Sequence, residues 1–327
     1  MRADGHEVIR LIRRPAAGAA ARADGAAGAG GAAGATASPG GTGRMTAGAA
    51  AASGWDPDEA DGGLDPQALA GVETVIHLAG AGVADKRWTA ARKAEIRDSR
   101  IRGTRALATG LARLAEQGQG PAVLLCGSAV GWYGDTGGRE VDETTPPGSG
   151  FLADLVRDWE AAAQPARDAG MRTVHLRSGL VLAPSGGTLG KLVPIFRLGL
   201  GARLGAGTQC MSWISLADEV GAIRFLLGQA GISGPVNLTS PQPVTNAAFT
   251  AALNDALGRP ALLRLPVPGL RIPAWAPGVP ATVLRLAVGE VAGELLSSAR
   301  VLPRRLIDSG YAFQHTSITA ALSYALA

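Results

Sequence analysis

Short apolar runs alternate along the first half of the chain with longer segments whose apolar residues recur every three or four positions. The short runs predict buried strands, and the periodic segments predict helices that pack on one face. Strands that alternate with helices are typical of a parallel, doubly wound α/β sheet. The predicted strands cover residues 7–12, 72–78, 122–126 and 173–176, and the predicted helices cover 66–69, 89–117 (with Thr89 as N-cap) and 151–169.

The second half of the chain has weaker periodicity, and glycine interrupts it at 186–187 and between 199 and 207. Its pattern predicts a helix that Asp218 caps and that ends near residue 227. Further strands are predicted at 211–214 and 236–238, and further helices at 246–257 and 284–296. We expect a first domain over 1–182, a smaller α/β substrate lobe over 183–258 interleaved with its core, and a C-terminal module over 259–327.

Residues 15–53 are a low-complexity tract of alanine and glycine with scattered threonine, serine and proline. Such a tract buries too little apolar surface to offset the entropy lost on ordering. We therefore predict a disordered surface insertion that ends where Trp55 restarts order.

The run at 75–80 is the most informative of the predicted strands, because it ends in Ala79 and Gly80. Small residues at the end of a buried parallel strand let a cofactor approach the backbone closely. A dinucleotide-binding fold should also begin with a strand, a glycine-rich turn and a helix that holds the pyrophosphate. The chain instead begins with what resembles a last helical turn with Gly5 as C-cap, so we expect its first strand and turn to be missing.

Composition excludes several classes of protein. The net charge is only +4, and basic residues are interleaved with acidic ones, so we expect no nucleic-acid partner. No apolar run approaches the ~20 residues of a membrane span, and no signal peptide opens the chain, so we expect a cytoplasmic protein without a membrane partner. Cys126 and Cys210 are far apart and have no metal-ligand spacing, so we expect no metal site.

Several segments resemble the extended short-chain dehydrogenases/reductases, namely 77–80, 127–134, 177–182 and 211–214 with Asp218. Finer matches at 84–89, 99–101, 133–135 and 157–160 resemble an atypical subgroup of epimerase family proteins. The segments 290–296 and 300–306 resemble the DUF1731 module that ends such proteins. The resemblance implies a Rossmann-type NAD(P)-binding domain, a small-molecule substrate and a homodimer formed through the two long helices.

The resemblance and the chemistry of the residues together give the candidate sites. Ser128, Tyr133 and Arg100 are the catalytic candidates, and Arg100 could bind a substrate anion or the cofactor phosphate. Each has a structural alternative: a turn-capping hydroxyl, a pocket-lining aromatic, and an ion pair with Asp98 or Glu95. Arg13 and Arg14 end the strand that corresponds to the second strand of the family's fold. Arginine at that place accommodates the extra phosphate of NADP, so NADP(H) is favoured over NAD(H). The cofactor candidates are Arg13, Arg14, Leu78, Ala79, Gly80, Ser128, Arg177, Gly179 and Leu180. The substrate candidates are Met211, Trp213, Lys86, Arg87 and Trp88. The cation pair Lys86 and Arg87 beside an aromatic ring suits an anionic planar substrate. The alternative is a solvated loop that Trp88 anchors.

One departure from the resemblance affects the expected chemistry. The usual reductase pair of a tyrosine and a lysine four residues later is absent, and alignment puts Leu152 and Val156 at these positions. We expect an NADP(H)-binding oxidoreductase or nucleotide-sugar-epimerase-like enzyme acting on a small polar substrate. The alternatives are a non-catalytic NADP(H) sensor or scaffold, or a truncated fragment without function.

Overall fold

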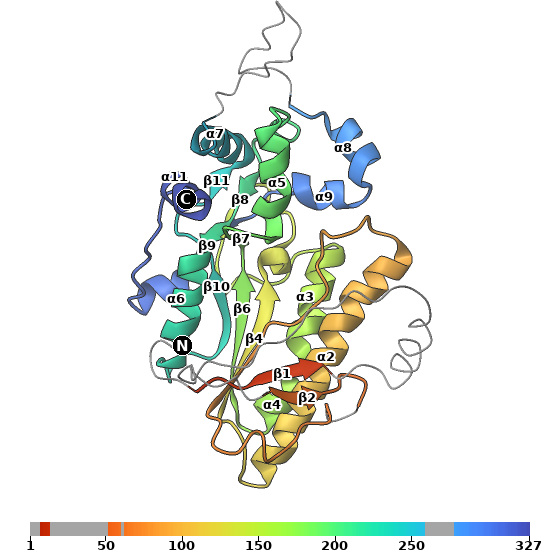
Figure 1. Ribbon diagram of the computed structural model, residues 1–327, viewed down its shortest axis with the longest axis vertical. Coiled ribbons are helices and arrows are strands. Elements are labelled where there is room, and N and C mark those ends of the chain that lie inside the picture. Colours follow the sequence, from red (N-terminus) through yellow and green to blue (C-terminus); the bar gives the residue numbers. More distant parts are fainter. Residues whose placement is uncertain (1–6, 14–51, 60–61, 259–277) are drawn as a thin grey trace, which may run out of the picture.

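The computed structural model describes residues 7–13, 52–59, 62–258 and 278–327. At its centre is a four-stranded parallel sheet in the order β10-β6-β4-β3 (Figure 1). Because all four strands are parallel, their carboxyl ends meet at one edge, where open α/β sheets bind ligands. The strands are β3 (Thr74–His77), β4 (Val123–Ala129), β6 (Arg172–Ser178) and β10 (Gly234–Leu238).

Helices cover both faces of this sheet, as Figure 1 shows. Alternate residues of β4 serve the two faces: Leu124 and Cys126 pack with α2 and α4, whereas Leu125 packs with α6. The predicted doubly wound α/β sheet is therefore confirmed, and so is Thr89 as the N-cap of α2. The helices on one face are α2 (Ala90–Glu116), α3 (Phe151–Ala161) and α4 (Gln164–Asp168), and α6 (Leu216–Leu227) lies on the other.

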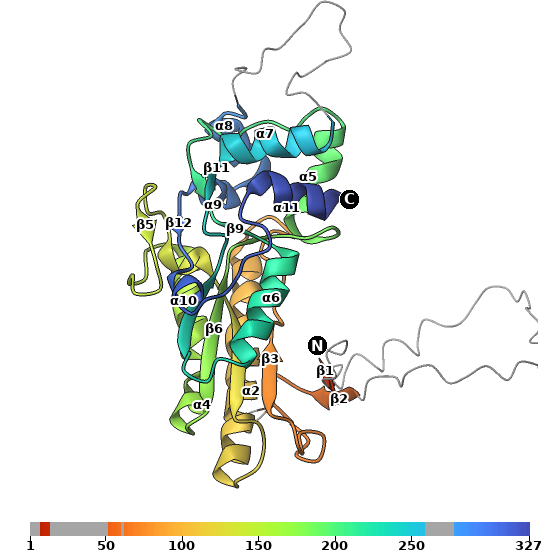
Figure 2. The same cartoon turned by 90° about the vertical axis from the view of Figure 1, so that its left-hand side faces the viewer.

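The first two strands are separate from the central sheet. β1 (Arg10–Arg13) and β2 (Ala52–Trp55) form a two-stranded parallel sheet of their own (Figure 2). Among the described residues, β3 is therefore an edge strand with β4 as its single neighbour. The expected helical turn with Gly5 lies outside the described residues, as does the predicted insertion except for its last two residues, which open β2.

A second lobe stands on the carboxyl edge of the sheet (Figures 1 and 2). Its core holds Trp213, Phe249 and Leu322, which come from distant parts of the chain. The sequence pattern missed α5, because Gly190 and Pro194 interrupt its apolar stripe. The elements are β7 (Leu180–Leu182) parallel to β9 (Trp213–Ser215), β8 (Cys210–Met211) antiparallel to β11 (Val244–Thr245), and helices α5 (Gly187–Arg197), α7 (Asn246–Ala256) and α11 (Ile318–Leu326).

The C-terminal segment returns to both lobes. The helix predicted at 284–296 is in fact two, α8 (Ala281–Val288) and α9 (Val291–Leu296), because Gly289 adopts a φ of +68°. β12 (Arg300–Val301) then pairs with β5 (Glu140–Val141) and leads into α10 (Arg304–Asp308). The helix predicted at 66–69 was also wrong, since these residues form successive turns. No described helix is long and apolar enough to cross a membrane.

Candidate functional site at the carboxyl edge of the sheet

The end of β3 is open, as its small residues predicted. Leu78 is 59% exposed, and the two residues that follow it, Ala79 and Gly80, are also exposed. The ends of the next two strands lie alongside, with Ser128 of β4 in register with Arg177 of β6. The structure thus brings the predicted cofactor residues of β3, β4 and β6 to one edge of the sheet.

Ser128 and Arg177 meet on a shared carboxylate that the sequence analysis did not single out. The hydroxyl of Ser128 donates to Oε1 of Glu160 on α3, at 2.6 Å. The guanidinium of Arg177 donates to both oxygens of Glu160, at 2.8 and 2.9 Å. The Arg177 side chain is only 2% exposed, so this is a buried bidentate ion pair.

Tyr133 belongs to the same network. Arg177 Nη1 donates to the Tyr133 hydroxyl at 3.1 Å, and that hydroxyl donates to Oδ1 of Asn237 at 2.8 Å. The guanidinium carbon also lies 3.9 Å from the centre of the Trp132 ring, within cation–π range. Burial raises the pKa of Tyr133 to about 12, so its phenol stays protonated at neutral pH. Tyr133 is therefore a neutral, fully engaged hydroxyl that holds Arg177 in place.

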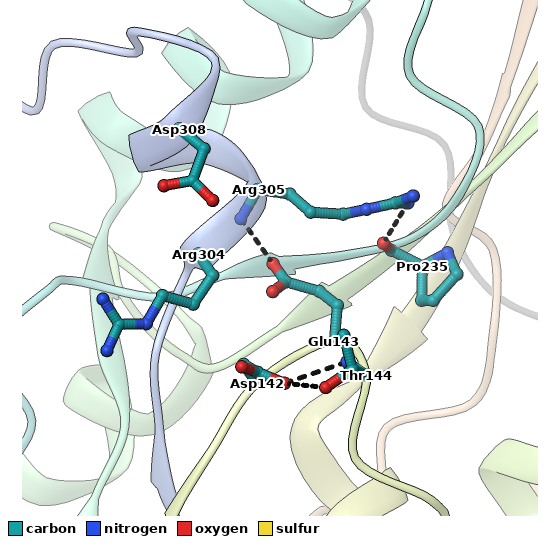
Figure 3. A pocket seen from close by; sticks show the side chains of 7 residues that line it. All are labelled: Asp142, Glu143, Thr144, Pro235, Arg304, Arg305 and Asp308. Carbon is teal, nitrogen blue, oxygen red and sulfur yellow. Dashed lines mark hydrogen bonds between the residues drawn. The ribbon is translucent and has the colours of Figure 1, made fainter.

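The network ends beside a pocket next to β10, the outer strand of the sheet farthest from β3. Figure 3 shows the side chains that line this pocket. Glu143 Oε1 accepts from the backbone N–H of Asn237 at 3.0 Å and from that of Arg305 at 3.4 Å. Burial raises the pKa of the Glu143 carboxyl. The pocket has a volume of about 410 Å³ and is lined by Asp142, Glu143, Thr144, Pro235, Arg304, Arg305 and Asp308.

The two positions of the usual tyrosine and lysine are apolar and packed. Val156 is buried, and Leu152 packs against the cluster of Trp88 and Ile96. A methyl group at Gly131 would come within 3.2 Å of Leu152, so the loop after β4 fits closely over this helix face. No side chain of these two positions can exchange a proton, which removes the usual reductase acid.

Arg100 lies apart from the Glu160 network, on α2 beneath the open strand end. Its Nη1 donates to the carbonyl oxygens of Ala81 and Ile96, at 2.8 and 3.2 Å. Its guanidinium carbon lies 5.1 Å from the centre of the Trp159 ring. The expected alternative, an ion pair with a neighbouring acid, does not form within the described part of the chain.

The predicted substrate loop is divided between solvent and core. Lys86 and Arg87 are exposed, whereas Trp88 is buried. The Trp88 indole donates to the carbonyl of Val83 at 2.9 Å and its ring packs edge-on against Phe151. Trp88 therefore anchors the loop rather than presenting a face to a ligand.

Most of the remaining candidates lie where packing leaves them little or no surface for contact with a ligand, and one lies outside the described residues. Trp213 is fully buried in the core of the second lobe, and Met211 and Leu180 are half-buried beside it. Gly179 is needed for packing, because a methyl group there would lie 2.6 Å from the carbonyl oxygen of Ser212. Arg13 ends β1, and Arg14 lies outside the described residues.

Comparison with known proteins identifies the family. Residues 1–238 match the "NAD dependent epimerase/dehydratase family", which is more than half of the chain. The chain belongs to this family. Residues 279–325 match the "Domain of unknown function (DUF1731)". The resemblance to an epimerase family protein with a DUF1731 ending is therefore confirmed, while the exact domain boundaries stay a prediction.

Relatives of this epimerase family chain come from bacteria and animals. It is 46% identical over 272 residues to the epimerase family protein Mb2239 of Mycobacterium bovis, covering 83% of each chain. It is 34% identical over 254 residues to the epimerase family protein SDR39U1 of Mus musculus, covering 76% of this chain and 80% of that protein. The crystal structure of human SDR39U1 (isoform 2) with NADPH superposes with a TM-score of 0.70 at 30% identity, covering 84% of this chain and 90% of that one.

Sequence reasoning missed Glu160 and Asn237 because their roles depend on contacts made across the fold. Glu160 lies 17 residues before its arginine partner, and Asn237 lies 104 residues after Tyr133. One local signal was present. Glu160 is a half-buried acidic residue in the last turn of the helix at 151–161, and Arg177 is the residue before the last of the buried strand that follows. Buried charges in proteins are paired, so the two could have been matched.

A serine, a histidine and an aspartate also meet near the start of α6, but the arrangement is structural. Ser215 Oγ donates to Asp218 at 2.8 Å, while His315 Nδ1 lies 3.1 Å from the same hydroxyl. Ser215 and Asp218 are fully buried, so no substrate reaches them. Ser215, not Asp218 as predicted, is the N-cap of α6.

Glu219 makes stability depend on pH. The Ser178 hydroxyl donates to its Oε1 at 2.6 Å, but Oε2 is buried without a partner among the described residues. Burial raises the pKa of Glu219 from 4.5 to about 7. The folded state therefore binds more protons than the unfolded state between these pH values, so this group lowers stability as pH rises through that window, by about 3 kcal/mol in full.

We expect Glu219→Gln to lose this pH dependence. The free energy of unfolding of the variant minus that of the parent should increase by about 3 kcal/mol from pH 4.5 to pH 8, measured by urea denaturation. Glu116→Gln, at an exposed position on α2, is the control and should give a flat difference. A flat difference for Glu219→Gln as well would show that its carboxyl titrates normally.

Proposed function

We propose that this chain binds NADP(H) at the carboxyl ends of β3, β4 and β6 and is an oxidoreductase acting on a small polar substrate. The observation that carries the proposal is the exposed end of β3, where small residues follow a buried parallel strand beside Ser128. The solved structure of human SDR39U1 with NADPH, similar over most of both chains, supports it.

The residues at this edge fit a dinucleotide. Gly80 puts no side chain on the exposed backbone after β3, and a methyl group there would come within 3.3 Å of the Arg100 side chain beneath it. We infer that Leu78, Ala79 and Gly80 would hold the coenzyme along their backbone, and Arg13 stays the candidate for the adenosine phosphate because arginine at that strand end accommodates it. When bound, the nicotinamide would supply or accept a hydride.

Ser128 is the residue of this chain that we assign to the substrate oxygen. Its hydrogen is donated to Glu160, so the lone pairs of its Oγ remain able to accept a hydrogen bond from a substrate hydroxyl. Arg177 fixes Glu160, and Tyr133 fixes Arg177, so both are positioning residues. A proton leaving the substrate hydroxyl would pass to Ser128 Oγ as Ser128 passes its own to Glu160.

A second function, coenzyme binding without catalysis, has an observation in its favour. Leu152 and Val156 replace the usual proton-transfer pair, and the Tyr133 hydroxyl is enclosed by two partners. Such a protein would bind NADP(H) as a ligand that stabilises one conformation.

Direct titration tests the proposal. We expect NADPH to bind, followed by its own fluorescence, and to bind more tightly than NADH by about tenfold, which corresponds to about 1.4 kcal/mol. With any carbonyl compound found to be reduced, Ser128→Ala should lower kcat by about 10²–10⁴-fold and change the Kd for NADPH far less. Absence of binding by either dinucleotide would refute the proposal, and binding without turnover on a broad carbonyl panel would favour the non-catalytic function.

A further inference from the structure

Arg100 is a half-buried cation whose partners carry no negative charge. Its hydrogen bonds go to the backbone carbonyls of Ala81 and Ile96. Within the described ranges it forms no ion pair, whereas Arg97 on the same helix pairs with Asp158. Its pKa is lowered, first by burial and then by the charge of Arg92. A buried guanidinium without a counter-ion is costly unless something else supplies the charge.

A second cation stands beside it. Arg92 is only 7% exposed, and its guanidinium donates to the carbonyl of Gly82, one residue after the carbonyl that Arg100 holds. Arg92 also pairs with Glu95 at 2.7 Å and with Asp85 at 4.0 Å, so both acids near it already have a cation. The Nε of Arg92 is buried without a partner among the residues described. The two guanidiniums therefore support residues 81 and 82 from below, and of the two only Arg100 has no acidic partner within the described residues.

The loop that these arginines hold is the continuation of the open strand end. Ala79 and Gly80 are exposed and lie over Arg100, whose Cγ and Cζ would be 3.3 Å from a methyl group at Gly80. Ser99 accepts a hydrogen bond from the N–H of Ala81, which fixes the loop further. Arg100 itself is half-buried, so part of its side chain remains accessible beside the proposed coenzyme edge.

We propose that Arg100, supported by Arg92, is an anion-binding subsite and that the substrate carries a carboxylate or phosphate group. This inference rests on the proposed function, because it places the subsite beside the coenzyme. Of the two places where the sequence allowed an anion contact, the exposed pair Lys86 and Arg87 and the half-buried Arg100 of α2, it chooses Arg100. Guanidinium groups recognise both anions by paired hydrogen bonds. Arg100 also lies where a coenzyme phosphate could reach, so the experiment must separate these two sources.

The experiment uses inorganic phosphate as the probe and the full chain as the protein. Phosphate binding is measured by titration calorimetry without coenzyme and at saturating NADPH, for the parent and for Arg100→Met. Arg97→Met is the matched control, since Arg97 is an exposed arginine of the same helix with an ion pair of its own. Arg100→Lys retains the charge and should recover part of the binding, and thermal melts show whether each variant folds.

We expect phosphate to bind the parent with and without NADPH, Arg100→Met to weaken it at least tenfold, and Arg97→Met to leave it unchanged. Equal binding by the parent and Arg100→Met would overturn the subsite. Phosphate displaced by NADPH, together with weaker NADPH binding by Arg100→Met, would assign the subsite to the coenzyme and overturn the substrate inference. Phosphate binding that depends on Arg100 in a protein that binds no NADPH would support the subsite and refute the proposed function instead.

Discussion

Arg177→Met is expected to lower the free energy of unfolding by about 3–5 kcal/mol, because it leaves the Glu160 carboxylate buried without its cation. Glu160 accepts two hydrogen bonds from Arg177, and one of its oxygens also accepts from Ser128. Methionine has a similar length but no donor, so the carboxylate keeps only the serine. Tyr133 would lose its donor as well, although its bond to Asn237 remains.

A double-variant cycle separates this cost from lost packing. Glu160→Gln keeps an acceptor for Ser128 and removes the charge, so adding it to Arg177→Met should recover part of the loss. We expect a coupling energy of about 1–3 kcal/mol from urea denaturation of the parent, the two single variants and the double variant. Additive effects would show that the loss comes from packing around Trp132 rather than from the ion pair.

The parallel sheet and its longest helix could be predicted because local signals agreed with the fold. In α2 the buried Ile96, Leu107 and Leu111 follow helical spacing, and the hydroxyl of Thr89 accepts from the N–H of Arg92, as an N-cap does. Elements whose stability comes from tertiary packing gave weaker signals. Phe196 and Leu189 of α5 are buried against the second lobe, but glycine and proline within this helix hide the pattern.

The candidate site was predicted in part for a similar reason. The end of β3 could be recognised because small residues after a buried strand leave the backbone open to a ligand. Ser128 and Arg177 could be placed beside it because the carboxyl ends of parallel strands meet at one edge of the sheet. The sequence does not show which carboxylate a buried arginine meets. Glu160 and Asn237 therefore became visible only when α3, β6 and β10 were placed side by side. For Trp213 and Gly179, which the resemblance offered as substrate and cofactor residues, packing explains the residue type.

Asp218→Ala is expected to destabilise the protein by about 2–6 kcal/mol, because this carboxylate joins the C-terminal segment to α6. Asp218 is fully buried and accepts from the N–H groups of Gln314 and His315, at 2.7 and 2.9 Å, and from the hydroxyl of Ser215. Alanine would leave the two backbone donors without an acceptor, at about 1–3 kcal/mol each. Since α11 follows directly and packs on α7, its loosening would also expose the core of the second lobe.

The measurement is the midpoint and slope of urea unfolding for Asp218→Ala, with Asp255→Ala at an exposed position of α7 as the control. Asp218→Asn retains one oxygen acceptor and should lose less than alanine does. Limited proteolysis supplies a second test, because a released C-terminal segment would be cut near residues 309–317 in Asp218→Ala before the rest of the chain. A variant as stable and as resistant to protease as the parent would show that packing of α11 alone holds this segment, and that the hydrogen bonds of the buried carboxylate add nothing to it.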